Sequence, residues 1–474
     1  MEKNVFKFDN FISSKRFCFE NYSLKLKDTK NEREPYRSEF HRDFDRLIFS
    51  KSFRRLAKKT QVHPLADNDN IHNRLTHSLE TSSVARSLGL ILGNYIEEER
   101  RSMTSAEGEN YEPSYNSHDI STIIQAACLA HDIGNPPFGH AGEDVIKNWS
   151  SEHLNKKTDL SLDDQEKNDL MNFDGNPQGF RIVTKLENDR NNGGLSLTIT
   201  TLGAMIKYPC FSDKSDKKFG FYKSEKDTVN EIFKEFGLIK KDSAIDWNIY
   251  LRHPLSYLSE VADDICYSLL DISDAVEMGI LDIDDKNIKE LFSLLMNNTK
   301  FSEIINDKNL SPSSKVGKLC AIAINNLTMH AANIYINNFD RFIDSRNGIK
   351  DLLSIFTDKN LHDGVLFAKQ LGSEKIFVED EKLKLEIAAN EIMGTILDLF
   401  VSAVEDLDGK KDINKVSFIN QKILKLMKVH QPSPNASLYE KYQCVLDYVA
   451  GMTDNFAVTL AQQIKGVRSS FQRI

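Results

Sequence analysis

The segment 131–143 holds four side chains that bind metals or transfer protons: His131, Asp132, His140 and Glu143. Glycines and prolines between them stop one helix and allow another to begin close by. The segment therefore predicts a helix that ends at a His-Asp pair, then a tight turn, then a second helix. His140 and Glu143 are three residues apart, so they would share one face of that second helix.

Two further residues are candidate metal ligands on other predicted helices. His77 lies on a helix expected over residues 71–96, and Asp263 lies on one expected over residues 255–279. Together with the His-Asp pair they would form a mixed nitrogen and oxygen site delivered by three helices. Such a site suits Mn²⁺, Mg²⁺ or Fe²⁺ and can also hold Zn²⁺. A single histidine on a helix is more often an ordinary core or surface residue, and spacing alone does not bring these residues together.

His140 and Glu143 have the types and the spacing for proton transfer. A carboxylate that holds one imidazole nitrogen fixes the tautomer and raises the basicity of the other nitrogen. The ring then exchanges protons with a metal-bound water or a leaving group. An ordinary surface pair at the same spacing is the alternative, and the local sequence leaves both readings open.

Other residues of the chain have side chains suited to a phosphate-rich, sugar-containing substrate. Three cationic candidates for phosphate binding are Arg74, Lys207 and Lys218. Asp263, Tyr267 and Asp271 recur every four residues and share one helix face. That face is either a solvated polar surface or the wall of a cleft. Most isolated lysines are solvent-exposed charges, so each lysine is weak evidence by itself.

The elements that must position these residues are mostly helices. Apolar residues recur at helical spacing over 71–96, 118–132 and 255–279, and strand signals are few. His131 continues the apolar stripe of its helix, so its ring is expected to point inward. A brief alternation over 195–200 allows one short strand. The predicted fold class is mainly α: a helical core, an additional C-terminal helical region, and at most a short β-hairpin.

The chain is expected to divide into three parts. Residues 1–35 are mixed and polar, which predicts an N-terminal arm with little core. Residues 36–280 would form the catalytic core, with polar insertions near 102–117 and 152–174. Residues 281–474 would form a helical region that packs on this core.

Composition excludes several classes of protein. The chain has 474 residues, 40% of them hydrophobic and 28% charged, which is ample for a sizeable core. No apolar run reaches the roughly 18 residues of a membrane span, and the N-terminus lacks the apolar core of a signal peptide. The six cysteines are scattered without a Cys-x-x-Cys pair. These features predict a cytoplasmic protein with reduced thiols, no membrane association and no cysteine-based metal site.

The charge distribution bears on nucleic-acid binding. A net charge of −9 argues against a basic surface that covers the whole protein. The segment 33–60 is nevertheless rich in arginine and lysine, with phenylalanine and leucine between them. It predicts amphipathic helix, and its basic face is either simply solvated or a surface for anions or for oligomer contacts.

Longer words accompany the candidate ligands in a fixed order from about residue 35 to 460: Phe53–Leu56, Gln61-Val62, Asn73–Glu80, His131–Glu143, Asp174–Arg181, Glu260–Tyr267 and Asp447–Asp454. With His77, His131-Asp132 and Asp263, they make the chain resemble the deoxyguanosinetriphosphate triphosphohydrolase family of the HD-domain metal-dependent phosphohydrolases. This resemblance implies an HD-type helical core. It also implies hydrolysis of a deoxynucleoside triphosphate, with dGTP preferred, to a deoxynucleoside and tripolyphosphate.

The resemblance also assigns residues to roles. The implied metal ligands are His77, His131, Asp132 and Asp263, and the implied catalytic pair is His140 with Glu143. The implied phosphate contacts are Arg74, Lys207 and Lys218. The implied nucleoside contacts are Gln61, Tyr267 and Asp271 for the deoxyribose and Val62 for the base. Some related enzymes have histidine where this chain has Asn135, so no role of that histidine carries over.

Cofactors and partners follow from the same resemblance. It implies one divalent metal per site, Mn²⁺ or Mg²⁺ foremost, with Fe²⁺ or Co²⁺ also compatible. It implies a homo-oligomer, with a hexamer favoured, and single-stranded DNA as a further ligand in some relatives. Two alternatives stay open: another HD phosphohydrolase acting as a nucleotidase or phosphodiesterase, and a regulator that binds single-stranded nucleic acid on an HD scaffold.

Overall fold

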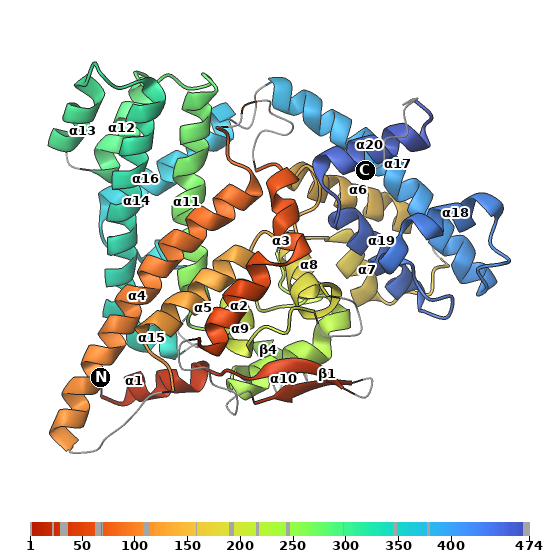
Figure 1. Ribbon diagram of the computed structural model, residues 1–474, viewed down its shortest axis with the longest axis horizontal. Coiled ribbons are helices and arrows are strands. Elements are labelled where there is room, and N and C mark those ends of the chain that lie inside the picture. The colour runs from red at the N-terminus through yellow and green to blue at the C-terminus, as the bar shows by residue number, and fades with distance from the viewer. Residues whose placement is uncertain are drawn as a thin grey trace.

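The computed structural model describes residues 2–20, 23–28, 37–61, 68, 70–107, 114–157, 159–188, 194–214, 218–242, 247–296, 298–344, 348–376 and 380–467. Within these ranges the chain forms 20 α-helices and two sheets of two strands each (Figure 1). The prediction of a mainly α fold is therefore confirmed.

The first half of the chain contains these elements: α1 (Glu2–Phe8), β1 (Arg16–Glu20), β2 (Ser23–Lys27), α2 (Glu39–Ile48), α3 (Lys51–Arg55), α4 (Arg74–Glu107), α5 (Ser117–Ala130), α6 (His140–Lys156), α7 (Asp164–Met171), α8 (Gly175–Arg181), α9 (Ile199–Met205), α10 (Lys226–Glu235), β3 (Ile239–Asp242) and β4 (Trp247–Tyr250). The second half contains these: α11 (Ser256–Glu277), α12 (Lys286–Leu295), α13 (Asn298–Asn306), α14 (Pro312–Asn337), α15 (Phe339–Ile343), α16 (Lys359–Leu371), α17 (Asp380–Lys410), α18 (Phe418–Leu426), α19 (Leu438–Ala450) and α20 (Asp454–Ile464).

Helix α5 is the central element of the fold. Its N-terminus is fixed by a capping box, in which the side chains of Asn116 and Asp119 each accept from the other residue's backbone N–H. Almost every residue of α5 is buried, and it contacts α2, α4, α9 and α11. A helix that is apolar on all sides belongs in a core. The α5 sequence therefore places its C-terminal end, and the residues that follow it, inside the molecule.

The buried side chains form two clusters, and the turn after α5 joins them. One cluster combines α4, α5, α9, α11, α12 and α14–α16, and the other combines α6, α7 and α17–α20. In Figure 1 these groups lie on opposite sides, with α12–α16 on the left and α17–α20 on the right. Ile133 belongs to the first cluster and Phe138 to the second. The segment between them is therefore held from both sides.

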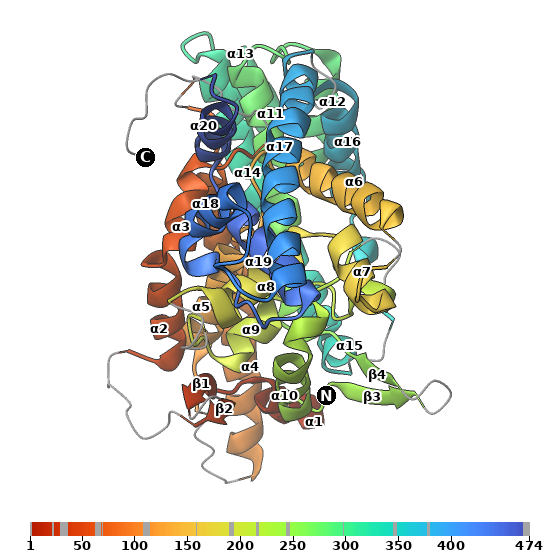
Figure 2. The ribbon, with the colours of Figure 1, turned by 90° about the vertical axis from the view of Figure 1, so that its right-hand side faces the viewer.

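Both small sheets are antiparallel hairpins at one end of the molecule. Figure 2 shows them beside α1 and α10, at the end opposite α12 and α13. Strand β1 pairs with β2, and β3 pairs with β4. The predicted strand over 195–200 is wrong, because Thr198 caps the N-terminus of α9 with its side chain and the helix begins at Ile199. An N-cap threonine satisfies an exposed helix N–H, and this preference outweighs the short apolar alternation.

Two further expectations need correction. The N-terminal segment was expected to have little core, but Val5, Phe8, Phe11 and Phe17 are buried in the first cluster. Of the two predicted polar insertions, the first begins as a continuation of α4 to Glu107. The second contains α7 and three buried apolar residues, Leu162, Leu170 and Phe173. The division of the chain at residues 35 and 280 stays a prediction.

Helix α17 is long and apolar enough, over Leu383–Lys410, to cross a membrane by length and composition alone. Its buried residues belong to the second cluster, where α17 contacts α6, α18, α19 and α20. These contacts are typical of a core helix in a folded domain.

Candidate functional site

Three of the predicted metal ligands converge where α4, α5 and α11 meet. His77 lies one turn into α4, His131 directly follows α5, and Asp263 lies two turns into α11. Nε2 of His77 is 3.1 Å from Oδ1 of Asp263, and Nε2 of His131 is 3.3 Å from the same oxygen. The three donor atoms all lie within 4.8 Å of one another. Two ligands about 2.1 Å from one ion and at right angles to each other are separated by roughly 3 Å, so this donor set fits a metal ion.

The orientation of His131 supports the same interpretation. Nδ1 of His131 lies 2.6 Å from the carbonyl oxygen of Cys128, so Nδ1 carries the proton and donates it. Nε2 faces Asp263. Burial lowers the pKa of His131, but Asp132 and Asp263 outweigh burial and raise the pKa, so a bound metal would take the place of a proton on Nε2. A metal-binding histidine usually has its second nitrogen hydrogen-bonded in this way. The mixture of imidazole and carboxylate without a thiolate suits Mn²⁺, Mg²⁺ or Fe²⁺.

Asp132, the fourth predicted ligand, lies beside this cluster. Its Oδ1 is 3.4 Å from Nε2 of His131 and accepts from Nδ2 of Asn135 at 2.6 Å. Its Oδ2 accepts from Nη1 of Arg74 at 2.7 Å. Burial by itself raises the pKa of Asp132, but Arg74 and the neighbouring histidines outweigh burial and lower the pKa. The carboxylate is therefore ionised at neutral pH, and its role as a ligand stays a prediction.

The Lys207 side chain lies at the candidate metal site formed by His77, His131 and Asp263, and not in solvent. Its Nζ donates to Oδ2 of Asp263 at 2.5 Å. Burial lowers the pKa of Lys207, but Asp263 outweighs burial and raises the pKa. The same lysine, with the two histidines, holds the pKa of Asp263 well below its usual range against the effect of burial. In the ligand-free protein, the Lys207 ammonium and the Asp263 carboxylate therefore form an ion pair at the candidate metal site.

A cleft of about 290 Å³ opens over the cluster. Most of the residues predicted for the site line it: Gln61, Arg74, His77, His131, Asp132, His140, Glu143, Lys207, Lys218, Asp263 and Tyr267. Asp271 lies one helical turn beyond Tyr267 on α11. It is buried and does not line the cleft. Val62 lies outside the described residues.

Two buried polar side chains in this cleft have hydrogen-bonding capacity left over. Nε and Nη2 of Arg74 are buried without a hydrogen-bond partner, and so is Oε1 of Gln61. A buried polar atom without a partner costs free energy, so such atoms usually have a ligand or water to bind. A guanidinium with two free N–H groups matches phosphate oxygens, and a free amide oxygen matches a hydroxyl donor.

His140 is the first residue of α6 and faces the same cleft as the metal cluster. The ring is exposed to the cleft, yet surrounding protein atoms and the cations Arg74 and Lys218 lower its pKa to about 4. His140 is therefore neutral at pH 7 and able to accept a proton.

Glu143 is buried one turn further along α6. Its Oε1 accepts from the backbone N–H of Gly175 at 2.9 Å. Burial, with a further contribution from Asp174, raises the pKa of Glu143. Among the residues described here no hydrogen bond joins Glu143 to His140, so the predicted catalytic pair stays a prediction.

Two glycines allow the turn between α5 and α6 to lie close to its neighbours. A Cβ atom on Gly134 would come within 2.1 Å of the backbone nitrogen of Gly179 in α8. A Cβ on Gly139 would come within 2.6 Å of Nη2 of Arg74, and Gly139 also has a φ of +59°. Only glycine fits such close approaches and a left-handed backbone without strain.

Several residues of the site were not predicted. The cleft is also lined by Asn135, Gly175, Asn176, Tyr208, Glu260 and Asp264. Gly175 and Asn176 lie in the Asp-Gly-Asn-Pro-Gln-Gly word, which was a signal for them. Lys59 is fully buried beneath the site and donates from Nζ to the carbonyl oxygens of Asn135 and Ala450. A lysine within a basic segment gave no sign of such a role.

The basic segment 33–60 is largely occupied by internal contacts, as far as the structure describes it. Arg46 donates to the carbonyl oxygens of Leu195 and Ser196. Arg37 pairs with Asp45, and Lys59 is buried. The exposed cations that remain on α3 and just after it are Lys51, Arg54 and Lys58. Few cations of this segment are thus left on the surface for a polyanion.

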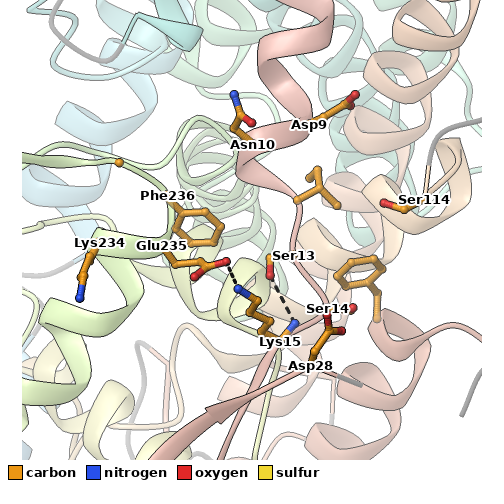
Figure 3. Close-up of a pocket in the computed structure, with 13 residues that line it drawn as sticks. Asp9, Asn10, Ser13, Ser14, Lys15, Asp28, Ser114, Lys234, Glu235 and Phe236 are labelled. Atoms are coloured by element: carbon orange, nitrogen blue, oxygen red, sulfur yellow. Dashed lines mark hydrogen bonds and ion pairs between the residues drawn. The ribbon is translucent and has the colours of Figure 1, made fainter. Parts of the chain in front are cut away.

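A larger cavity, of about 680 Å³, lies beside the N-terminal segment and the end of α10 (Figure 3). Lys15 and Glu235 form an ion pair at its wall, and Ser13, Asp9 and Phe236 lie around it. None of the described residues that line it is a histidine or a cysteine. The candidate metal ligands His77, His131 and Asp263 all line the smaller cleft instead.

Comparison with known proteins places these features in a family. The HD domain family matches residues 74–162, and the phosphohydrolase-associated domain family matches residues 418–463. A deoxyguanosinetriphosphate triphosphohydrolase-like protein of Pseudomonas aeruginosa (strain LESB58) is 38% identical over 92% of this chain and 94% of its own. A protein of the same description from Synechocystis sp. is 35% identical over 93% and 97%.

A more distant relative, the deoxyguanosinetriphosphate triphosphohydrolase of Cronobacter sakazakii, is 28% identical over 90% of this chain and 94% of its own. The matched HD segment carries His77, His131 and Asp132, three of the residues around the candidate metal centre. The chain belongs to the deoxyguanosinetriphosphate triphosphohydrolase family of HD-domain phosphohydrolases.

Proposed function

We propose that this protein is a metal-dependent deoxynucleoside triphosphate triphosphohydrolase that prefers dGTP. The observation that carries the proposal is the convergence of His77, His131 and Asp263 under a cleft that also holds Arg74 with unpartnered buried N–H groups. The family membership is consistent with it. The reaction would cleave the bond between O5′ and the α-phosphorus with water, which gives a deoxynucleoside and tripolyphosphate.

The metal would be held by His77, His131 and Asp263, with Asp132 as the fourth protein ligand, and Mn²⁺ or Mg²⁺ is the favoured ion. When bound, a divalent metal polarises a phosphoryl oxygen and makes bound water more acidic. Lys207, which pairs with Asp263 in the ligand-free protein, would turn to a phosphate oxygen when a metal neutralises that carboxylate. Arg74 and Lys218 would bind the remaining phosphate charge.

His140 would transfer a proton during the reaction. Because its pKa is lowered to about 4, its ring is available at neutral pH to take a proton from the attacking water or to share one with the departing O5′. Glu143 would orient the His140 ring when a bound substrate brings His140 closer to Glu143. Gln61, with an unpartnered buried Oε1, would accept a hydrogen bond from the deoxyribose. Tyr267 and Asp271 would contact the same sugar, and Val62 would contact the base.

Product analysis tests this proposal. Each of the four dNTPs is incubated with the protein and Mn²⁺ or Mg²⁺, and the products are separated by ion-exchange chromatography. Deoxyguanosine and tripolyphosphate are expected, with dGTP turned over fastest. Release of dGMP with pyrophosphate, or of dGDP with phosphate, would contradict the assigned bond. Asp263→Ala should remove the activity, whereas Asp227→Ala, on the exposed side of α10, should leave it unchanged.

The same product analysis, repeated with other nucleotides, distinguishes the proposed activity from those of the alternative enzymes. A nucleotidase or phosphodiesterase on this scaffold would act on nucleoside monophosphates, cyclic nucleotides or guanosine polyphosphates instead. Turnover of one of these at a higher kcat/KM than dGTP would replace the proposal. We expect the enzyme in the cytoplasm.

A further inference from the structure

The turn that carries His140 has an unusual backbone. Phe138 has a φ of +63° and the next residue, Gly139, has a φ of +59°. A bulky residue other than glycine rarely adopts a left-handed conformation, because its Cβ crowds the backbone. Such a conformation persists where the surroundings hold it in place. What holds this turn therefore matters for the position of His140.

One carboxylate from the C-terminal end of the chain holds it. Oδ1 of Asp454 accepts from the backbone N–H of Phe138 at 3.0 Å. Oδ2 accepts from the backbone N–H and from the hydroxyl of Thr60, at 3.0 Å and 2.5 Å. Asp454 is only 2% exposed and is the first residue of α20. The helix N-terminus favours a carboxylate there, and bonds to an ionised acceptor are stronger than neutral ones.

The two segments that Asp454 joins both lead into the cleft. Phe138 precedes His140 by two residues. Thr60 precedes Gln61 and forms a β-bridge with Asn73, which directly precedes Arg74. Both segments are therefore hydrogen-bonded to the same carboxylate, Phe138 to Oδ1 of Asp454 and Thr60 to Oδ2.

A second contact ties the same parts together. Nζ of Lys59 donates to the carbonyl oxygen of Ala450, at the end of α19, at 2.6 Å. It also donates to the carbonyl oxygen of Asn135, in the turn after the His-Asp pair. The C-terminal helices are thus joined to the turn between α5 and α6 in two ways, directly through Asp454 and indirectly through Lys59, and the bond of Asp454 is the one nearer to His140.

We propose that Asp454 is a positioning residue for catalysis: it sets the place of His140 and of Gln61 relative to the metal centre. By this role the segment 418–463, which matches the phosphohydrolase-associated domain, helps to build the active site from a distant part of the chain. The proposal rests on the proposed function for its kinetic consequence. The metal ligands themselves come from α4, α5 and α11, so the metal site does not depend on Asp454.

The test compares Asp454→Asn with Thr453→Ala. The asparagine keeps the size of the side chain but places an NH₂ group against either the Phe138 or the Thr60 donors. Thr453 is the N-cap of the same helix, where its side chain accepts from the N–H of Phe456, and among the described residues its side chain makes no hydrogen bond with the turn. Its substitution therefore destabilises α20 without removing the three hydrogen bonds that Asp454 accepts.

Asp454→Asn is expected to lower kcat for dGTP by about 10- to 100-fold, since a misplaced catalytic group has effects of this size. Its affinity for Mn²⁺, measured by titration calorimetry, should stay within about threefold of wild type. Thr453→Ala should keep kcat within about twofold at temperatures well below its Tm. A kcat for Asp454→Asn within about twofold of wild type would overturn the proposal, and so would an equal kcat loss in Thr453→Ala.

A measurement without substrate keeps the test independent of the proposed function. Amide hydrogen exchange at Phe138 or at Thr60 should become at least about tenfold faster in Asp454→Asn than in Thr453→Ala, because the asparagine NH₂ group leaves one of these two N–H groups without an acceptor. Unchanged exchange would overturn the positioning role even if the enzyme had another activity. If Asp454→Asn does not fold, Thr60→Val, which removes only the hydroxyl bond, is expected to lower kcat about threefold or more. A wild-type kcat for Thr60→Val would then count against the proposal.

Discussion

Arg74 connects the metal centre to the space that a substrate would occupy. One N–H of its guanidinium is fixed on Asp132 at 2.7 Å, while Nε and Nη2 are buried without a partner. The planar, forked guanidinium of Arg74 can therefore bind the Asp132 carboxylate and a substrate phosphate at the same time. A lysine at this position has the charge but not the fork.

We expect Arg74→Lys to lower kcat/KM for dGTP by about 10- to 100-fold, as expected for loss of a charge-assisted contact of roughly 1.5–3 kcal/mol. The measurement is steady-state kinetics under saturating Mn²⁺. Arg86→Lys, an exposed change on the same helix, is the matched control and should have no effect. Equal kinetics for the two variants would show that the fork is not used.

His140 gives the second prediction at this scale. His140→Ala should keep metal binding, because the metal cluster lies on other elements, and should lose about 10²–10⁴-fold in kcat, the usual contribution of an acid–base group. Single-turnover kinetics with dGTP would measure the chemical step directly. The exposed His118→Ala on α5 serves as control. A rate within about threefold of wild type would remove the assigned role.

At the scale of elements, the loop before α11 is fastened to the N-terminal segment through a buried histidine. Nε2 of His253 lies 3.0 Å from the carbonyl oxygen of Phe11, and its Nδ1 accepts from the N–H of Leu255 at 3.2 Å. The ring is therefore neutral, with its proton on Nε2. Burial lowers the pKa of His253 to about 4 despite the bond to Phe11.

This arrangement predicts a loss of stability in mild acid. An unfolded histidine titrates near 6.5, so the unfolded chain binds a proton before the folded one does. The stabilising contribution is complete above about pH 6.5 and is lost as the pH falls toward 4. Tm should therefore fall more steeply in wild type than in His253→Gln between pH 7.5 and 5, which narrows the Tm difference between them. A constant difference across this range would contradict the assignment.

At the scale of the whole molecule, the metal site connects three helices that are far apart in sequence. His77, His131 and Asp263 come from α4, the end of α5, and α11. A ligand that binds only the folded state stabilises that state. Removing the metal should therefore affect both activity and folding.

We expect exhaustive treatment with EDTA to abolish dGTP hydrolysis and Mn²⁺ to restore it. Mn²⁺ at about 100 times its Kd should add roughly 2.7 kcal/mol to the free energy of unfolding, seen as a rise in Tm by scanning calorimetry. His77→Gln should lose both effects. Full activity in EDTA-treated protein, checked free of metal by elemental analysis, would contradict a metal-dependent reaction.

The outer surface bears on assembly. Phe49 after α2 is 76% exposed, Phe418 and Ile419 on α18 are 71% and 61% exposed, and Val429 is 72% exposed. Exposed apolar residues mark contacts between proteins where they are contiguous, as Phe418 and Ile419 are on α18, and not where they are scattered singly. We expect a homo-oligomer, with a hexamer favoured, which light scattering after gel filtration would show as a mass six times that of one chain. A monomer at micromolar concentration would contradict this expectation.

Local patterns in the sequence were enough for the helical fold and for the turn that follows the His-Asp pair. The apolar periodicity placed the helices that became α4, α5 and α11 to within three residues at five of their six ends, whereas α4 continues to Glu107, 11 residues beyond its predicted end. The His-Asp pair, followed by glycines and prolines, marked the turn between α5 and α6. These signals lie within a few residues of each other, because helix periodicity, capping and turn preference are all short-range effects.

Only the tertiary structure decided which side chains meet. The three candidate metal ligands converge because α5 is buried between α4 and α11, and the periodicity of one helix does not specify its neighbours. Asp454 is 316 residues from Phe138 and 394 from Thr60, so no local pattern links them. Lys59 looked like one cation of a basic segment, yet its side chain is buried with the amine against two carbonyl oxygens. Contacts between distant segments depend on how all the apolar surfaces pack at once, and that packing appears only in the folded chain.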